Sequence, residues 1–252
     1  MSSAMMSSRT NSADILGIGA QKAATSWAAA MLNLHPDVWF PEADALEGKE
    51  VRFFDTANWQ HGVEWYQRIM TPPRPDLLAT DVSPGYSRIG GDRIRACHRL
   101  SPAARVFFIV RNPIERDWSS LLMQAARLQF DVTAASFVDL MVFYDHRRIS
   151  QFTTYEQTIN RWRRFYGEQL WVGVYDDLLA APEEFFKALC DHVGLAVDAI
   201  PDWRTRTRAR VFEGPKVTIP EPMAEFLAKK YDPMVRRLGD LPGRDLTGWI
   251  AA

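Results

Sequence analysis

The sequence has few cysteines, no long apolar run and no signal-peptide-like apolar core in its first residues. Cys97 and Cys190 are its only cysteines, which excludes a disulfide framework and predicts reduced, buried thiols. No apolar run approaches the roughly 20 residues that span a bilayer. The first 12 residues are rich in serine and methionine and have no apolar core like that of a signal peptide. These absences predict a cytoplasmic protein without a membrane span.

Surplus charge and common ligand motifs are missing as well. The formal net charge is −1, so bulk charge would not hold nucleic acid, although a local basic cleft would be hidden in that sum. The chain has no His-x-x-x-His or Cys-x-x-Cys pair of metal ligands, and it lacks the Gly-Lys-Ser/Thr triplet of a Walker A loop. We therefore expect neither a nucleic acid partner nor a metal.

What the sequence does contain is an alternation of strand-like and helix-like segments. Residues 105–110 (RVFFIV) are a continuous apolar run, typical of a strand buried on both faces. The alternation predicts a single α/β domain over residues 13–252, with a central parallel sheet flanked by helices, after a disordered tail over residues 1–12. The remaining expectations are strands at 15–18, 77–82 and 170–175, an extended piece at 51–54, and helices at 25–34, 115–129, 155–165, 182–193 and 221–238.

Residues 19–27 (GAQKAATSW) lie between the first expected strand and the first expected helix. In that position, free backbone N–H groups and the positive end of a helix face an anion. Lys22 adds a mobile cation, and Thr25 and Ser26 add hydroxyl donors. The segment predicts either a P-loop-like strand-loop-helix that binds phosphate or an ordinary turn with a solvated lysine.

A second polar segment follows the strand at 105–110. Arg111 stands at the carboxyl end of this strand, and Ser119 comes eight residues later in the next helix. A guanidinium fits two phosphate oxygens and a hydroxyl a third, and open α/β sheets bind ligands beyond the carboxyl ends of their strands. Alone, Arg111 would be interpreted as a capping or ion-pairing residue; together with Lys22 it indicates a second phosphate site.

These segments resemble the motifs of sulfotransferases that use 3′-phosphoadenosine 5′-phosphosulfate (PAPS). Residues 22–27 (KAATSW) are similar to the 5′-phosphosulfate loop of that family, and Arg111 with Ser119 is similar to its 3′-phosphate motif. Residues 49–55 (KEVRFFD) are similar to the Lys-Glu-x-His-Phe-Phe segment of the heparan-type and Golgi-type branch. With weaker similarity elsewhere, the resemblance covers residues 14–195.

The resemblance implies transfer of the PAPS sulfuryl group, by in-line displacement, to a hydroxyl of a small metabolite or glycoside, leaving adenosine 3′,5′-bisphosphate. It implies that Lys22 stabilises the leaving oxygen without a metal. Trp27 would stack on the adenine or, alternatively, belong to the core of the first helix. The residues implied to bind the donor are Gln21, Lys22, Ala23, Ala24, Thr25, Ser26, Trp27, Arg111, Ser119 and, on a poor match, Lys216.

The acceptor hydroxyl needs a general base. Glu50 matches the glutamate to which the resemblance assigns this role; the alternative is a surface glutamate paired with Lys49 or Arg52. Asp81, at the end of an expected strand, is the second candidate for the base. Arg52, Asp81 and Tyr86 are the expected acceptor-binding residues.

Two positions depart from the family pattern. Ala24 stands where the family usually has glycine, which is costly if the backbone takes a positive φ. Arg52 stands where the branch usually has histidine, and this fixed cation would favour an anionic acceptor or pair with an acidic neighbour. Two other functions stay open: a nucleotide-dependent kinase with a divergent phosphate loop, and a non-catalytic nucleotide-binding relative.

Overall fold

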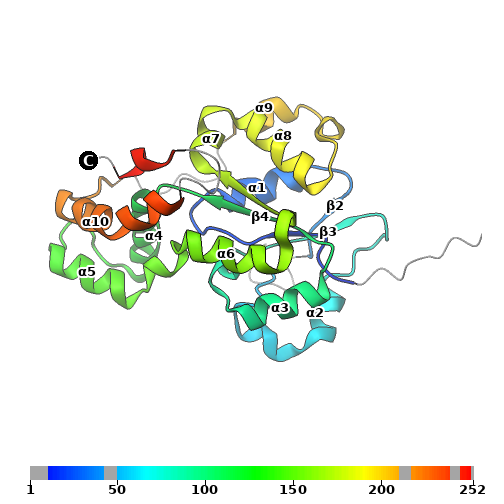
Figure 1. Cartoon of the computed structure of the whole chain (residues 1–252), viewed down its shortest axis with the longest axis horizontal. Coiled ribbons are helices and arrows are strands. Elements are labelled where there is room, and N and C mark those ends of the chain that lie inside the picture. The colour runs from blue at the N-terminus through cyan, green and yellow to red at the C-terminus, as the bar shows by residue number, and fades with distance from the viewer. Residues whose placement is uncertain (1–10, 43–49, 210–216, 239–244, 251–252) are drawn as a thin grey trace, which may run out of the picture.

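The computed structural model describes residues 11–42, 50–209, 217–238 and 245–250, and strands and helices alternate over much of this part of the chain (Figure 1). The strands are β1 (Ile15–Gly17), β2 (Val38–Trp39), β3 (Leu78–Val82), β4 (Arg105–Val110) and β5 (Leu170–Val174). The helices are α1 (Thr25–Leu32), α2 (Val63–Ile69), α3 (Gly91–Leu100), α4 (Pro113–Leu128), α5 (Phe137–His146), α6 (Tyr155–Tyr166), α7 (Tyr175–Ala180), α8 (Pro182–Val193), α9 (Trp203–Thr207) and α10 (Glu221–Leu238).

The strands form one parallel sheet in the order β2-β3-β1-β4-β5. At the centre, Gly17 of β1 pairs with Val82 of β3 on one side and with Phe107 of β4 on the other. The chain fills one side of β1 first and then crosses to the other, so the strand order reverses between β1 and β4. Such a reversal is where open α/β sheets bind their ligands, beyond the carboxyl ends of the strands.

Helices cover both faces of the sheet, as the sequence predicts. In Figure 1, α1, α7, α8 and α9 lie on one face, and α3 and α6 lie on the other. Between these layers, all the residues of β4 after Arg105 have no exposed surface, which explains the unbroken apolar run at 105–110. The α/β architecture with a central parallel sheet is therefore confirmed.

Helix α4 starts directly after β4 and carries the second polar segment. Asn112 caps it, because its side-chain oxygen accepts a hydrogen bond from the N–H of Ile114 at 2.9 Å. Pro113 follows in the first turn, where its missing N–H costs nothing. Helices α5 and α10 pack together with α4 at one end of the molecule (Figure 1).

The strands and helices that the sequence predicts are present, with ends shifted by a few residues at most. The extended piece predicted at 51–54 is wrong, because Arg52 has a φ of 52° and the chain turns there. The pattern did not indicate β2, α2, α3, α5, α7 or α9. The predicted tail, residues 1–12, lies outside the described residues except for Asn11 and Ser12, and Ser12 is buried.

Three short 3-10 helices matter for the site and its surroundings: η3 (Pro84–Arg88), η4 (Ile149–Phe152) and η7 (Thr247–Trp249). Others are η2 (Ala57–His61), η5 (Gly167–Gln169) and η6 (Val197–Ala199). Cys97 and Cys190 are free and buried, as predicted. Of the helices in the described ranges, none has the length and apolar character needed to cross a bilayer.

Candidate active site

The loop between β1 and α1 lies at the point where the strand order reverses. Three of its residues have a positive φ: Gly19 (136°), Lys22 (69°) and Ala24 (62°). The N–H of Ala20 donates to the carbonyl of Ile109 at 2.9 Å, and the N–H of Ile109 donates to the carbonyl of Gly19 at 2.8 Å. With a third bond, from the N–H of Ile18 to the carbonyl of Phe107 at 3.0 Å, backbone hydrogen bonds tie the loop to β4.

Ala24 takes the left-handed conformation at the start of α1. This conformation costs a residue with a Cβ roughly 1–2 kcal/mol, so the departure from glycine has the cost that the sequence analysis foresaw. No side chain of the described residues caps this end of α1. The helix dipole favours an anion at this end of α1.

Lys22 and Arg111 meet beyond the carboxyl ends of the neighbouring strands β1 and β4. A guanidinium nitrogen of Arg111 (Nη1) donates to the backbone carbonyl of Lys22 at 3.0 Å. The same guanidinium lies 4.7 Å from the ring centre of Tyr175 and pairs with Glu115 at 3.0 Å. Tyr155 donates its hydroxyl proton to the carbonyl of Arg111 at 2.9 Å. The structure thus joins the two residues on which the sequence analysis depends most.

The Lys22 side chain lies in a positively charged surrounding. Burial lowers its pKa, and the nearby guanidinium groups of Arg111, Arg127 and Arg116 lower it further. Of these arginines, Arg111 and Arg116 are paired with carboxylates, whereas Lys22 forms no ion pair within the described ranges. A half-buried cation among other cations fits an anionic ligand, and a phosphosulfate has that chemistry.

Further predicted donor residues surround this loop. Ser120 of α4 donates to the side-chain carbonyl of Gln21 at 3.3 Å, which joins α4 to the loop. Ser119 precedes it on α4 and is half-buried; in the first turn of α1, Thr25 is buried and Ser26 half-buried. The Ser120 hydrogen bond therefore brings α4, which carries Ser119, next to the loop that precedes α1.

Of the two interpretations of Trp27, the structure favours the core tryptophan. Its residue is 7% exposed, and its ring centre lies 6.0 Å from that of Phe185 and 5.9 Å from that of Phe186. Its indole N–H donates to the carbonyl of Thr207 at 3.1 Å. Little ring surface is left on which an adenine could stack.

Lys216 and Lys49 lie outside the described residues. Val217, the first described residue after them, accepts a hydrogen bond at its carbonyl from the indole N–H of Trp118 at 2.7 Å. Val217 therefore lies against α4, the helix that carries Ser119.

The other half of the site is the segment around Glu50. Glu50 is half-buried, and its carboxylate lies 3.9 Å from the guanidinium of Arg52. Arg52 also donates to the carboxylate of Asp55 at 3.4 Å, and Arg88 approaches that carboxylate to 3.9 Å. Arg52 thus pairs with acidic neighbours, which is one of the two outcomes expected for the residue that replaces histidine.

Asp81 holds this segment from within the core. One of its oxygens accepts a hydrogen bond from Ser83 (2.6 Å) and the other accepts one from Tyr86 (2.7 Å). These two hydroxyl oxygens in turn accept hydrogen bonds from the backbone N–H groups of Arg52 and Phe53, each at 3.0 Å. Burial raises the pKa of Asp81 to about 7, although both hydroxyl groups act in the opposite direction.

The structure corrects the prediction that Asp81 and Tyr86 contact the acceptor. Both side chains are 0% exposed, and their polar atoms are used in the hydrogen bonds just described. Asp81 is therefore neither placed to act as a base nor to bind an acceptor. It positions the backbone of residues 52–53, next to Glu50.

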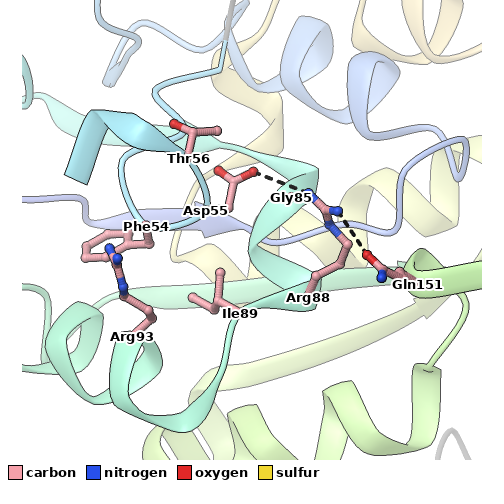
Figure 2. A pocket seen from close by; sticks show the side chains of 8 residues that line it. All are labelled: Phe54, Asp55, Thr56, Gly85, Arg88, Ile89, Arg93 and Gln151. Atoms are coloured by element: carbon pink, nitrogen blue, oxygen red, sulfur yellow. Dashed lines mark hydrogen bonds and ion pairs between the residues drawn. The ribbon is translucent and has the colours of Figure 1, made fainter. Parts of the chain in front are cut away.

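A pocket of about 280 Å³ opens beside Asp55 (Figure 2). An added Cβ at Gly85 would lie 1.9 Å from the Asp55 carboxylate, so only glycine permits this close approach. The Asp55 side chain is 2% exposed, and burial raises its pKa against the opposing effect of Arg52 and Arg88. The pocket is lined by Phe54, Asp55, Thr56, Gly85, Arg88, Ile89, Arg93 and Gln151.

Two lining groups of the pocket have hydrogen-bonding capacity left over. One oxygen of Asp55 (Oδ1) and one guanidinium nitrogen of Arg93 (Nη1) are buried and have no hydrogen-bond partner among the described residues. Both atoms are themselves buried, so a molecule in the pocket would not reach them without a side-chain movement. Arg93 is held over the ring of Trp59, 4.1 Å from its centre.

Sequence reasoning missed most of these pocket residues. Asp55 ends the segment 49–55 and could have been included with Glu50 and Arg52. Arg88 and Arg93 follow the polar end of β3, which is a weak signal at best. Gln151 comes from η4, and nothing in its sequence neighbourhood indicates a pocket.

Residues 60–199 match the family model described as "Sulfotransferase family". This match covers more than half of the 252 residues. The chain belongs to the sulfotransferase family. As an enzyme of that family it transfers sulfuryl groups, which decides against the kinase and the non-catalytic alternatives.

Individual relatives agree with the family match. The human heparan sulfate glucosamine 3-O-sulfotransferase 6 is 24% identical over 255 residues, which cover 92% of this chain and 72% of that protein. The human bifunctional heparan sulfate N-deacetylase/N-sulfotransferase 1 is 32% identical over 113 residues, covering 42% of this chain and 12% of that protein. A solved sulfotransferase from Alicyclobacillus acidocaldarius has the same fold: its TM-score is 0.76 at 21% identity, and the alignment covers 95% of this chain and 99% of that one.

Proposed function

We propose that this sulfotransferase uses PAPS as its donor and a hydroxyl of a small metabolite or glycoside as its acceptor. The observation that carries the proposal is the meeting of Lys22 and Arg111, which share a 3.0 Å hydrogen bond where the strand order reverses. Relatives whose names describe sulfotransferases of heparan sulfate support a saccharide-like acceptor.

The donor would lie along the carboxyl ends of β1 and β4. Lys22 and the N-terminal end of α1 would hold the 5′-phosphosulfate, and Arg111 with Ser119 would hold the 3′-phosphate. When bound, PAPS supplies the sulfuryl group: the acceptor oxygen forms a new S–O bond, and the S–O bond to the bisphosphate breaks. Lys22 would stabilise the negative charge that grows on the leaving oxygen.

The acceptor would enter from the pocket beside Asp55. Its hydroxyl proton would pass to Glu50, whose carboxylate Arg52 can orient from 3.9 Å. Arg88 lines the pocket and its side chain is 31% exposed, so it would donate a hydrogen bond to an oxygen of the acceptor. Both halves of the site would then align the attacking and leaving oxygens, which is the main demand of such a transfer.

Nucleotide binding tests the donor. We expect adenosine 3′,5′-bisphosphate at 100 times its dissociation constant to stabilise the protein by roughly 2.7 kcal/mol. ATP at the same concentration is the control, since it carries no 3′-phosphate for Arg111 and Ser119. Stabilisation by ATP and none by the bisphosphate would show that the donor is wrong.

A screen of hydroxylated acceptors with labelled PAPS identifies the product by its mass shift, and Glu50→Gln then tests the base. We expect turnover to fall about 10²–10⁴-fold, the usual contribution of a general base, while affinity for the bisphosphate stays unchanged. Near-normal turnover would make Glu50 a structural residue.

A further inference from the structure

A buried ion pair on α4 lies between the two halves of the site. A guanidinium nitrogen of Arg116 (Nη2) is 2.7 Å from a carboxylate oxygen of Asp117 (Oδ1), and both side chains are 0% exposed. Neither can touch a bound molecule. Burying charges costs free energy even when they are paired. The hydrogen bonds that the pair makes with its neighbours show which segments it holds in place.

The pair fixes both ends of η4. The Arg116 nitrogen also donates to the carbonyl of Ile149, the first residue of η4, at 2.9 Å. The hydroxyl of Thr153, the residue after η4, donates to the same Asp117 oxygen that faces Arg116. The other Asp117 oxygen accepts hydrogen bonds from Tyr144 of α5 and Tyr231 of α10.

Helix η4 in turn fixes Arg88 at the pocket. The side-chain carbonyl of Gln151 accepts a hydrogen bond from Arg88 at 3.3 Å, and the Arg88 guanidinium lies 4.2 Å from the ring centre of Phe152. Figure 2 shows Arg88 between Gln151 and Asp55. An unbroken series of contacts therefore leads from α4 through η4 to the pocket.

We propose that Arg116 and Asp117 are positioning residues that set the affinity for the acceptor, by holding η4 and through it Arg88. The proposal rests on the proposed function, which makes the pocket the acceptor site. Helix α4 would then serve both substrates: its Ser119 would hold the donor together with Arg111, which precedes the helix, and its buried pair Arg116 and Asp117 would order the acceptor pocket.

Two matched variants separate this role from a general contribution to stability. Thr153→Val and Tyr231→Phe each delete one hydroxyl that donates to Asp117, with little change in side-chain volume. Only Thr153 adjoins η4, whereas Tyr231 belongs to α10. Asp117→Asn is less suitable, because it would leave Arg116 buried without a counter-charge and endanger folding.

Hydrogen exchange tests the structural step without any activity. Removing a hydrogen bond to a buried charge should raise local opening about tenfold or more. We expect Thr153→Val to speed exchange at residues 149–153 and 84–89, and Tyr231→Phe to speed it in α10 only. Unchanged exchange at η4 in Thr153→Val, or equal changes in both variants, would overturn the proposal.

Steady-state kinetics with an acceptor from the screen tests the functional step. We expect Thr153→Val to raise the KM for the acceptor about 3–10-fold, with kcat and the KM for PAPS unchanged. This pattern is expected when an interaction is lost that binds the ground state and the transition state equally well. Thr153→Ser, which keeps the hydroxyl, should restore the wild-type KM, and Tyr231→Phe should leave it unaltered. An acceptor KM that does not respond to Thr153→Val would refute the positioning role. A protein that binds no bisphosphate and transfers no sulfuryl group would instead refute the proposed function. In that case, hydrogen exchange in Thr153→Val would still test whether Asp117 holds η4 and Arg88 in place.

Discussion

The proposed donor and acceptor halves of the site are both rich in arginine, but they balance charge differently. Around Lys22, burial and three arginines act against its positive charge, and it forms no ion pair within the described ranges. Around Asp55, the cations Arg52 and Arg88 each face a carboxylate. The unpaired positive charge of Lys22 thus lies where a polyanionic donor would bind. The charges around Asp55 are paired, and they lie where a less charged acceptor would bind.

The two halves also use different devices to fix the backbone. The donor loop depends on positive φ values at Lys22 and Ala24 and on hydrogen bonds to β4. The acceptor segment depends on one buried carboxylate, Asp81, that acts through Ser83 and Tyr86. Substitutions in the donor half should therefore change chemistry and binding, whereas a substitution at Asp81 should change pH-dependent stability.

The largest effect that we expect concerns Lys22. Lys22→Ala should lower kcat by about 10²–10³-fold, because the ammonium would stabilise charge that develops only as the S–O bond breaks. Affinity for the bisphosphate should fall much less. Single-turnover transfer from saturating PAPS, with binding measured separately by calorimetry, checks both.

Lys22→Arg is the matched control, and it should rescue only in part, since a planar guanidinium places its charge differently. A wild-type rate for Lys22→Ala at saturating PAPS would reduce the donor loop to a binding site and remove the contrast between the two halves.

The second prediction concerns Asp81 and pH. Its pKa is about 7 in the folded protein and 3.8 when unperturbed, so the folded state keeps a proton that the unfolded chain loses. This contribution to stability is fully present below about pH 4 and is lost as the pH rises to about 7, at roughly 1.4 kcal/mol per pH unit. Urea unfolding of wild type and Asp81→Asn at several pH values should show this slope in their difference. Parallel pH profiles would contradict the buried acid.

A moderate effect is expected at the 3′-phosphate site. Arg111→Ala and Ser119→Ala each remove a hydrogen bond to that phosphate, worth about 1–3 kcal/mol of binding free energy. The measurement is the ratio of affinities for the nucleotide with and without its 3′-phosphate. An unchanged ratio in both variants would move the 3′-phosphate site elsewhere.

The smallest effect is expected at Ala24. Ala24→Gly relieves the left-handed conformation and loses part of that gain to the greater freedom of the unfolded chain, so we expect a net stabilisation of roughly 0.5–1 kcal/mol. Ala23→Gly is the control. Ala23 has no positive φ, so replacing it with glycine should destabilise the folded protein. Equal destabilisation by both variants would show that the donor loop does not store this strain.

The sequence predicted the donor half better than the acceptor half, and the reason is physical. Lys22 and Arg111 each follow a strand of a parallel sheet, and this topology brings strand ends to one edge. Asp81 also lies near the end of a strand, but its carboxylate is buried and both of its oxygens accept hydrogen bonds from nearby hydroxyl groups. Periodicity does not reveal which polar side chain at a strand end points inward.

The pocket depended on contacts that no local pattern encodes. Gln151 reaches Arg88 across 63 positions, and Arg93 is oriented by the ring of Trp59. The turn at Arg52, with its positive φ, was likewise invisible in an apolar run that suggested an extended chain. Tertiary packing decided these features, and only the structure shows them.

The hydrogen bond from Arg111 to Lys22 spans 89 positions of the chain and has a consequence for folding. During synthesis, the loop with Lys22 is made long before β4 can pair with β1, and such long-range parallel pairing is slow. A nascent or partly folded chain would therefore carry half of the donor site and could not hold the nucleotide at both ends. Bisphosphate would bind and stabilise only chains in which β1 and β4 have come together, so the nucleotide would act as a selective ligand of the completed sheet.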